Sequence, residues 1–491
     1  MSVATAPRAT RSMALTRRAR RPEPLAFLRE RGMGASVLVA TISSAFGVLL
    51  LSTTGFLAAA MRADPFFGGS ATAEIVIGIL SSLLIGVAVY VASIVTANTF
   101  ATIVAGRTRR IALMRLIGAS ARSQRAELAR QGLAVGAIGA GLGLVLGTCV
   151  ADLLVRFGAP AIGVDVAYTV VRAELLIPAV VVALTTWAAA WAGSRRVLTV
   201  TPLQALGGST QRSHHGRTRP PGRNVGAIVL AVRGAALLGL GVVVGLVDPL
   251  GVVIAFFGGL LSFTAIAIGS TLVMPPLLKV VGRLFGASVT ARLASENATR
   301  YPERSSRMAI GVVIGVTLVT MFAVALESTK AVLTAAGGGV MPPETAAAMD
   351  TFAGVMMGLV AVSAVIAGVG LVNLLTIGVV QRRTELGLLR ALGLTKSQIR
   401  QVVLLEATHV TVTAVGFGLL LGIVYGWIAA QATFGSIPAM LGQPATVVVP
   451  AVPWAPVVII VLATAVLTLV ASVAPTRLAT RIAPVAALAG E

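Results

Sequence analysis

The stretch QRRTELGLLRALGLTKSQIRQVVLLE, residues 381–406, separates two long apolar runs and decides the fold. Within it, apolar residues recur at the spacing of a helix, and charged residues lie between them. The apolar set is Leu386, Leu389, Ala391, Leu392 and Ile399. Gly393 interrupts this pattern, so the stretch predicts an amphipathic helix-turn-helix at a membrane surface.

A second copy of this stretch lies earlier in the chain, at residues 107–131, RTRRIALMRLIGASARSQRAELARQ. A shift of 275 residues superimposes the two copies without a gap, and it also matches the apolar runs beside them. The matched pairs are Asn98 with Asn373, Arg107 with Arg382, Arg115 with Arg390, Gly118 with Gly393, Arg125 with Arg400, Gly141 with Gly416, Gly143 with Gly418 and Gly147 with Gly422. The sequence therefore predicts a repeated unit in which membrane helices flank a basic surface loop.

The composition predicts an all-α polytopic membrane protein. Of the 491 residues, 56% are hydrophobic and 11% are charged, and the mean hydropathy is +0.93. No soluble core needs that much apolar surface. Ten segments are long enough to cross a hydrocarbon layer of about 30 Å. They lie near 35–61, 74–105, 132–155, 175–193, 225–246, 250–278, 308–329, 350–380, 407–430 and 454–473.

The positive charge of the chain indicates its topology. The net charge is +22, and most of the Lys and Arg residues gather in six segments between or beside the apolar runs. These segments are 1–34, 106–131, 194–224, 279–307, 381–406 and 474–491. The positive-inside rule then predicts a multi-pass membrane protein with the two terminal segments and the four loops between them in the cytoplasm. The same charge favours anionic membrane lipids as partners, and the absence of interleaved aromatic residues argues against nucleic acid.

These patterns divide the chain into six parts. Two four-helix repeats are joined by a linker and two further membrane helices, and each repeat is preceded by a short interfacial helix. The expected boundaries are 1–34 for the basic tail with its interfacial helix, 35–206 for the first repeat, 207–224 for the cytoplasmic linker, 225–278 for the two linking helices, 279–307 for the second interfacial segment and 308–491 for the second repeat.

The motif R-x-x-E-L-G-L-L-R-A-L-G at 382–393, with P-V-A-A-L at 484–488, resembles the FtsX/MacB-like permeases of ABC transporters. The resemblance spans both repeats. It implies that the loop of each repeat is a coupling helix that docks on a separate cytoplasmic ABC ATPase subunit, and that the permease acts as a dimer or pseudo-dimer. By the same resemblance, the ATPase-coupling residues are Arg382, Glu385, Arg390, Gly393, Leu394 and Thr395 in the second copy and Arg115, Gly118, Ala119 and Ser120 in the first. The first copy has Arg110 where the pattern has Glu385.

The chain carries no sequence signature of an active site. A phosphate loop needs a lysine after glycine, and none of Lys279, Lys330 and Lys396 follows one. Cys149 is the single cysteine and the three histidines are scattered, so no metal set is expected. We therefore expect a transmembrane subunit that is not an enzyme and holds no cofactor, with ATP-Mg bound on the partner ATPase.

Two groups of residues are expected to pack helices. The pairs Gly143 with Gly147 and Gly418 with Gly422 place small residues on one helix face, which suits either packing within the chain or a seam with a second permease copy. Asn98 and Asn373 occupy matching positions and are expected to form interhelical hydrogen bonds.

The function expected from the resemblance is ATP-driven export, or extraction from the membrane, of an amphiphilic molecule such as an antibiotic, peptide, lipid or haem-like compound. Movement of the ATPase would be transmitted mechanically through the coupling helices. The short outer connections favour direct action within the bilayer. An alternative function is a signalling component that uses ATPase motion to control a sensor kinase or a cell-wall hydrolase.

Overall fold

The computed structural model describes residues 33–63, 117–158, 168–194, 221–284, 288–300, 302–336, 383–440 and 449–480, with isolated residues between 78 and 114, between 339 and 354, and at 442, 444 and 447. Within these ranges the secondary structure is helical. The helices are α1 (Met33–Ala63), α4 (Ala121–Leu153) with a π turn η2 (Leu154–Gly158), η3 (Ala173–Leu175), α6 (Leu176–Gly193), α8 (Pro221–Gly245), α9 (Gly251–Gly282), α10 (Val289–Arg300), α11 (Pro302–Ala336), α13 (Arg383–Ala391), α14 (Lys396–Phe434), α15 (Ile437–Met440) and α16 (Trp454–Thr480).

Seven of the described helices are long and apolar enough to cross a membrane, namely α1, α4, α6, α8, α9, α11 and α14. The apolar part of α16, Trp454–Val470, is shorter. The expectation of an all-α polytopic membrane protein is confirmed. The predicted spans 74–105 and 350–380 fall almost wholly outside the described residues.

Several helices begin earlier than their apolar runs do. α4 starts at Ala121 and α14 at Lys396, eleven residues before the predicted spans 132–155 and 407–430. Each basic loop therefore continues into its membrane helix without a break. α11 likewise starts at Pro302 rather than near 308, because proline suits the first turn of a helix, where its missing N–H has no partner to lose.

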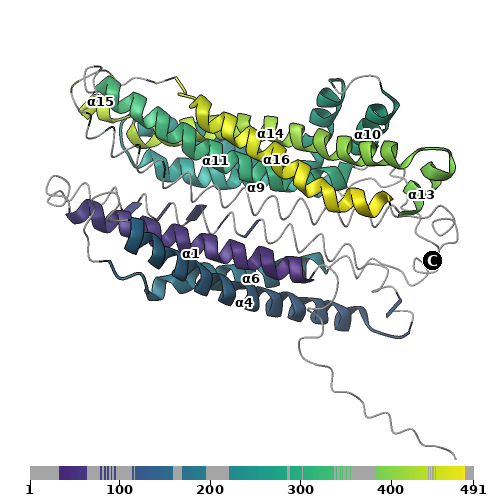
Figure 1. The fold of residues 1–491 in the computed structure, drawn as a ribbon. Coiled ribbons are helices and arrows are strands. Elements are labelled where there is room, and N and C mark those ends of the chain that lie inside the picture. Colours follow the sequence, from purple (N-terminus) through teal and green to yellow (C-terminus); the bar gives the residue numbers. More distant parts are fainter. Residues whose placement is uncertain are drawn as a thin grey trace, which may run out of the picture.

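Figure 1 shows two groups of helices, one made of α1, α4 and α6 and the other containing α9, α11, α14 and α16. In the first group, successive glycines of α4 meet successive turns of α1. A Cβ on Gly139, Gly143 or Gly147 would lie within 3.0 Å of α1 atoms, from Val37 at one end to Val48 at the other. The residue numbers rise together, so α1 and α4 run parallel and start at the same end of the bundle.

The second group repeats this arrangement with α11 and α14. A Cβ on Gly418 would lie 2.9 Å from Val316, and one on Gly422 would lie 2.4 Å from Thr320. Thr317 also donates a hydrogen bond to the Gly418 carbonyl at 3.2 Å. Small residues allow this close approach of backbones, which is how helices associate where no water drives them together.

The last helix of each repeat packs at an equivalent position as well. Gly136 of α4 lies against Thr186 of α6, where an added Cβ would be 2.9 Å from the threonine Cβ. The matching position on α14 is Thr411, which receives a hydrogen bond from Thr468 of α16 at 3.2 Å. The described helices of the two repeats thus share one packing scheme.

Helices α8 and α9 form a hairpin that packs against the second repeat. The turn between them is closed by Asp248, whose carboxylate accepts a hydrogen bond from the Leu250 N–H at 2.8 Å. α8 begins at Pro221, inside the segment expected to be a linker. α10 lies across α9 and α14, with Ala291, Ala294 and Ala298 buried.

Candidate functional site

The second basic loop is a rigid elbow between α13 and α14. Gly393 has a φ of +101°, in the left-handed region that favours glycine. The N–H of Leu394 donates to the carbonyl of Leu389 at 3.1 Å, and that of Gly393 donates to Arg390 at 3.1 Å. This pair of bonds is a Schellman motif, which satisfies the last carbonyls of α13 and turns the chain sharply.

A capping box starts α14 immediately after this turn. The Thr395 side chain accepts a hydrogen bond from the Gln398 N–H at 3.2 Å, and the Gln398 side chain accepts one from the Thr395 N–H at 2.9 Å. Such reciprocal caps satisfy donors that the first turn of a helix leaves unpaired. The elbow is therefore fixed by backbone geometry on both sides of Gly393.

The first basic loop has the same geometry at the matching positions. Gly118 has a φ of +98°. The N–H of Ala119 donates to the Met114 carbonyl at 3.0 Å, and Ser120 caps α4 by accepting from the Ser123 N–H at 3.1 Å. We name residues 113–131 the first elbow and residues 383–406 the second elbow.

A small apolar core holds α13 against the start of α14. Leu386, Ile399 and Val403 are buried in it, and Leu389 and Leu394 pack against its edge. Of the apolar residues that recur at helical spacing, Leu386, Leu389 and Ile399 belong to this core. Ala391 and Leu392, next to the turn at Gly393, are exposed.

Each elbow presents two exposed apolar residues that lie one helical turn apart. In the second elbow, Leu388 is 49% exposed and Leu392 is 72% exposed. In the first, Leu113 is 46% exposed and Ile117 is 78% exposed, and the shift of 275 carries this pair onto the other. We name these residues the elbow apolar pairs. The signal in the sequence was the recurrence of a large apolar residue directly before each turn glycine.

The remaining predicted coupling residues are distributed as follows. Glu385 is exposed on α13, and Arg390 is half-buried at its end. Leu394, Thr395, Ala119 and Ser120 form the turn and caps described above. Arg115, Arg382, Asn98 and Asn373 lie outside the described residues. The roles of all these residues in coupling remain predictions.

A buried polar contact lies beneath the second elbow. His409 of α14 is fully buried, and its Nε2 donates to the Leu278 carbonyl of α9 at 2.8 Å. Glu406, one turn earlier, is 5% exposed. Both residues lie near a helix start in the sequence, which suggests contact with water for Glu406 and allows either contact with water or a packed ring for His409. In the structure the His409 ring is packed and Glu406 is buried too, because α9 and α10 cover this part of α14.

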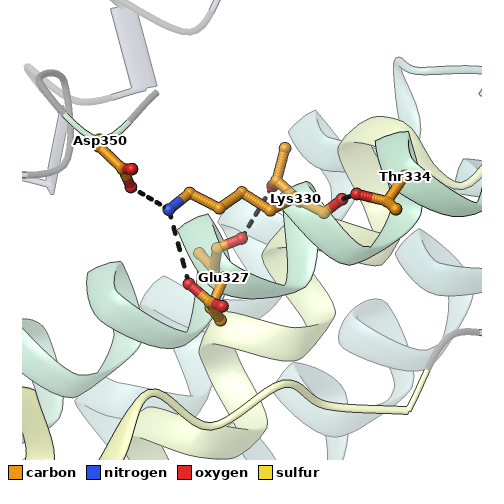
Figure 2. Close-up of polar contacts among 6 residues, drawn as sticks. Glu327, Lys330, Thr334 and Asp350 are labelled. Carbon is orange, nitrogen blue, oxygen red and sulfur yellow. Dashed lines mark hydrogen bonds and ion pairs between the residues drawn. The ribbon is translucent and has the colours of Figure 1, made fainter. Parts of the chain in front are cut away.

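A cluster of charged residues lies toward the opposite end of the bundle from the second elbow. Figure 2 shows Lys330 of α11 reaching toward Asp350 and Glu327. Lys330 donates a hydrogen bond to Asp350, and its Nζ is 3.8 Å from the Glu327 carboxylate. The lysine side chain is 22% exposed, against 67% for Asp350. This cluster joins α11 to the residue at which the predicted eighth span begins.

Within the described part of the chain, no three His, Cys, Asp or Glu residues lie close enough to hold a metal ion. The arrangement that is repeated and exposed is the pair of elbows. Both stand where α4 and α14 begin, at the right-hand end of the bundle in Figure 1. Fold and elbows together define a polytopic helical membrane protein in which an internal repeat produces two surface elbows.

The family follows from comparison with known proteins. The model of the family described as "FtsX-like permease C-terminal" matches residues 82–202 and 357–484, which together make up just over half of the chain. The chain belongs to the FtsX-like permease family. The two matched regions each contain one elbow, so the predicted resemblance to FtsX/MacB-like permeases of ABC transporters is confirmed.

One curated relative is similar over a shorter stretch. The macrolide export ATP-binding/permease protein MacB of Bordetella avium (strain 197N) is 31% identical over 87 residues. This match covers 18% of the present chain and 13% of the relative, so the chain spans only a small part of that protein's length.

Proposed function

We propose that this chain is the membrane subunit of an ABC transporter that exports an amphiphilic molecule or extracts it from the bilayer. A separate cytoplasmic ABC ATPase would bind ATP-Mg and dock on the two elbows. The observation that carries this proposal is that the two elbows, each with a left-handed turn glycine, present matching elbow apolar pairs at one end of the bundle. Family membership and the printed name of the MacB relative support the class.

The structure of the elbows suits the transmission of force. A flexible loop would absorb a push, but the second elbow is closed by a Schellman motif and a capping box on either side of a left-handed glycine. The first elbow has the matching left-handed glycine, the bond from the Ala119 N–H to the Met114 carbonyl, and the Ser120 cap of α4. The second elbow continues directly into α14, a single helix of 39 residues. At 1.5 Å per residue this helix is about 58 Å long, more than the thickness of the bilayer. A displacement of the elbow therefore tilts a helix that reaches the far side of the membrane.

Docking would use the elbow apolar pairs. Complete burial of a leucine side chain contributes about 1.5–3 kcal/mol, and Leu392 is 72% exposed. Each of the most exposed residues, Leu392 and Ile117, therefore has about 1–2 kcal/mol to gain from an apolar groove on a partner. This corresponds to roughly a tenfold change in affinity per elbow.

The test is the retention of the ATPase by elbow variants. Tagged Leu392→Asp, Ile117→Asp and the double variant are purified from membranes that also contain a candidate ABC ATPase, chosen because the native chain retains it on purification. The amount of ATPase per permease should fall at least tenfold in each single variant and further in the double variant. The matched control is Leu284→Asp, because Leu284 is 80% exposed at the end of α9 but belongs to neither elbow.

The outcome decides whether the elbow apolar pairs bind the ATPase or are exposed apolar side chains without a partner role. If the elbow variants retain as much ATPase as the Leu284→Asp control, the elbows are not the docking surface. If they lose the ATPase while inserting normally, substrate-stimulated ATP hydrolysis and export from inverted vesicles are the next measurements. A transporter should show both the stimulated ATP hydrolysis and the export, whereas a purely regulatory protein should show neither activity.

A further inference from the structure

An arginine lies near the middle of a helix that faces the lipid. The apolar span of α8 is Asn224–Gly245, and Arg233 is nine residues after its start and twelve before its end. At 1.5 Å per residue these separations are about 14 Å and 18 Å, so Arg233 is close to the centre of a hydrocarbon layer of about 30 Å. The side chain is exposed on the surface of the bundle.

The surface around Arg233 is apolar. Val232 is 64% exposed beside it, Val229 is 41% exposed one turn before it, and Leu240 is 49% exposed two turns after it. In the part of the chain that the structure describes, no carboxylate forms an ion pair with Arg233. A charged group in this position is unfavourable unless it is paired, and such residues commonly mark a binding site or a pathway.

A second copy of this chain is a poor partner for this face. A twofold axis along the membrane normal would bring Arg233 to the same depth as its counterpart, where the two positive charges repel. Asp152 is already paired with Arg156 at 2.8 Å, and Asp248 lies in the turn after α8. Among the described residues, we therefore find no exposed acidic side chain at the depth of Arg233 that could pair with it from a second copy.

An anionic amphiphile has both properties that this surface requires. Its headgroup supplies the negative charge, and the planar guanidinium of arginine pairs with a carboxylate or phosphate through two hydrogen bonds. Its hydrocarbon chain fits the exposed valine and leucine side chains of α8. It approaches α8 from the lipid, without crossing the protein core, and pairing with the guanidinium offsets the cost of a charged headgroup at this depth.

The position of Arg233 connects it to the second elbow. The neighbouring Gly234 packs on α9, where an added Cβ would be 2.5 Å from the Ser262 nitrogen. The Ser262 hydroxyl is 2.7 Å from the Tyr425 hydroxyl on α14. α14 is the helix that the second elbow begins, so this hydrogen bond, like the one from His409 to Leu278, joins the α8–α9 hairpin to the helix that would be tilted.

We propose that Arg233 and the outward face of α8, with Val229, Val232 and Leu240, form a lateral binding site for an anionic amphiphile within the bilayer. This site deepens the proposed function, on which its role in transport rests, by assigning the charge of the substrate class. The guanidinium binds the headgroup, and the exposed apolar side chains contact the chain. Binding itself needs no ATPase and is measurable on the chain alone.

The experiment measures binding with a spin-labelled fatty acid. Ala236→Cys is labelled with an environment-sensitive fluorophore in a Cys149→Ala background, because Ala236 is exposed one turn after Arg233 without belonging to the proposed site and Cys149 is the chain's single cysteine. The protein is placed in phosphatidylcholine nanodiscs in alkaline buffer, where the probe carboxyl is ionised. Quenching by doxyl-stearate is compared with quenching by its uncharged methyl ester. The anion should quench at a mole fraction lower by on the order of tenfold, as expected for a charge-assisted hydrogen bond.

Matched variants test the role of the charge. Arg233→Gln should remove the preference for the anion, and Arg233→Lys should keep part of it. The control Arg156→Gln removes one positive charge at the end of α4 and should leave the preference unchanged. Equal quenching by anion and ester in the labelled chain that retains Arg233, or a preference that survives Arg233→Gln, overturns the site.

The result separates this proposal from the proposed function. If the elbow variants keep their ATPase but the anion preference depends on Arg233, the site stands and the docking proposal fails. If docking holds but no preference is found, only the site fails. Co-purification of a small membrane protein that is lost in Arg233→Gln, together with equal quenching, would assign this face to a protein partner instead.

Discussion

The contact between α4 and α1 allows a test in which two glycines of the same helix are compared. A Cβ at Gly143 would lie 2.4 Å from the Thr41 carbonyl oxygen and 2.8 Å from the Ala45 nitrogen. These are backbone atoms of α1, which move only if the helices separate. A Cβ at Gly141, two residues away, would meet no atom within 4 Å. Gly143→Ala should therefore destabilise the protein, and Gly141→Ala should not.

The magnitude follows from two opposing effects. Replacing glycine by alanine inside a helix stabilises it by about 0.5–1 kcal/mol, and this gain is common to both variants. Overpacking at Gly143 costs about 1–3 kcal/mol. The difference in the free energy of unfolding between the two variants should thus be about 1–3 kcal/mol, with Gly143→Ala the less stable.

The assay is reversible unfolding in mixed micelles, followed by circular dichroism, with both variants measured beside the native chain. A second pair on α14 provides an independent comparison. Gly422 faces Thr320 at 2.4 Å, whereas Gly416 meets no atom within 4 Å. If Gly143→Ala proves as stable as Gly141→Ala, the close approach of α4 to α1 is wrong, and with it the packing scheme shared by the repeats.

Three further changes test other parts of the structure. Gly393→Ala places a side chain at a φ of +101°, which costs about 1–2 kcal/mol even though no atom lies within 4 Å of the new Cβ. The amount of ATPase that co-purifies with this variant should therefore fall. An unchanged amount would show that docking does not need the turn. Tyr425→Phe removes the hydrogen bond to Ser262 and should lower the free energy of unfolding by about 0.5–1.5 kcal/mol in the same assay. An unchanged free energy of unfolding would argue against that contact. Lys330→Met breaks the ion pair with the exposed Asp350 and should lower the free energy of unfolding by less than about 1 kcal/mol. A larger decrease, measured by thermal unfolding, would show that the ion pair is less exposed to water than in the structure.

Much of the fold could be predicted because its signals are local or repeated. Apolar length identified the membrane helices, since a hydrocarbon layer requires about twenty apolar residues. The shift of 275 residues identified both elbows and their turn glycines, because equal sequence produces equal caps and turns. The helical spacing of Leu386 and Ile399 predicted an amphipathic helix-turn-helix, and in the structure both side chains are buried between α13 and α14.

The sequence left burial open where it depends on which segments pack on a helix. Periodicity grouped Leu392 with Leu386 and Ile399, but only the latter two are buried, and Leu392 is exposed beside the turn at Gly393. A position near a helix start did not decide between water and packing for His409, which α9 and α10 cover. A one-dimensional pattern records which residues share a face of a helix, and it does not record which other helix reaches that face.

The sequence by itself determined the class of protein, the internal repeat and the positions of the two elbows, because hydrophobic length, charge and turn chemistry are properties of neighbouring residues. Only the tertiary structure decided which apolar residues of the elbows are left exposed and that Arg233 faces outward at mid-depth. Both depend on the order in which helices pack around one another, and that order is set by contacts such as Gly143 on Thr41 and Gly234 on Ser262, between residues far apart in the chain.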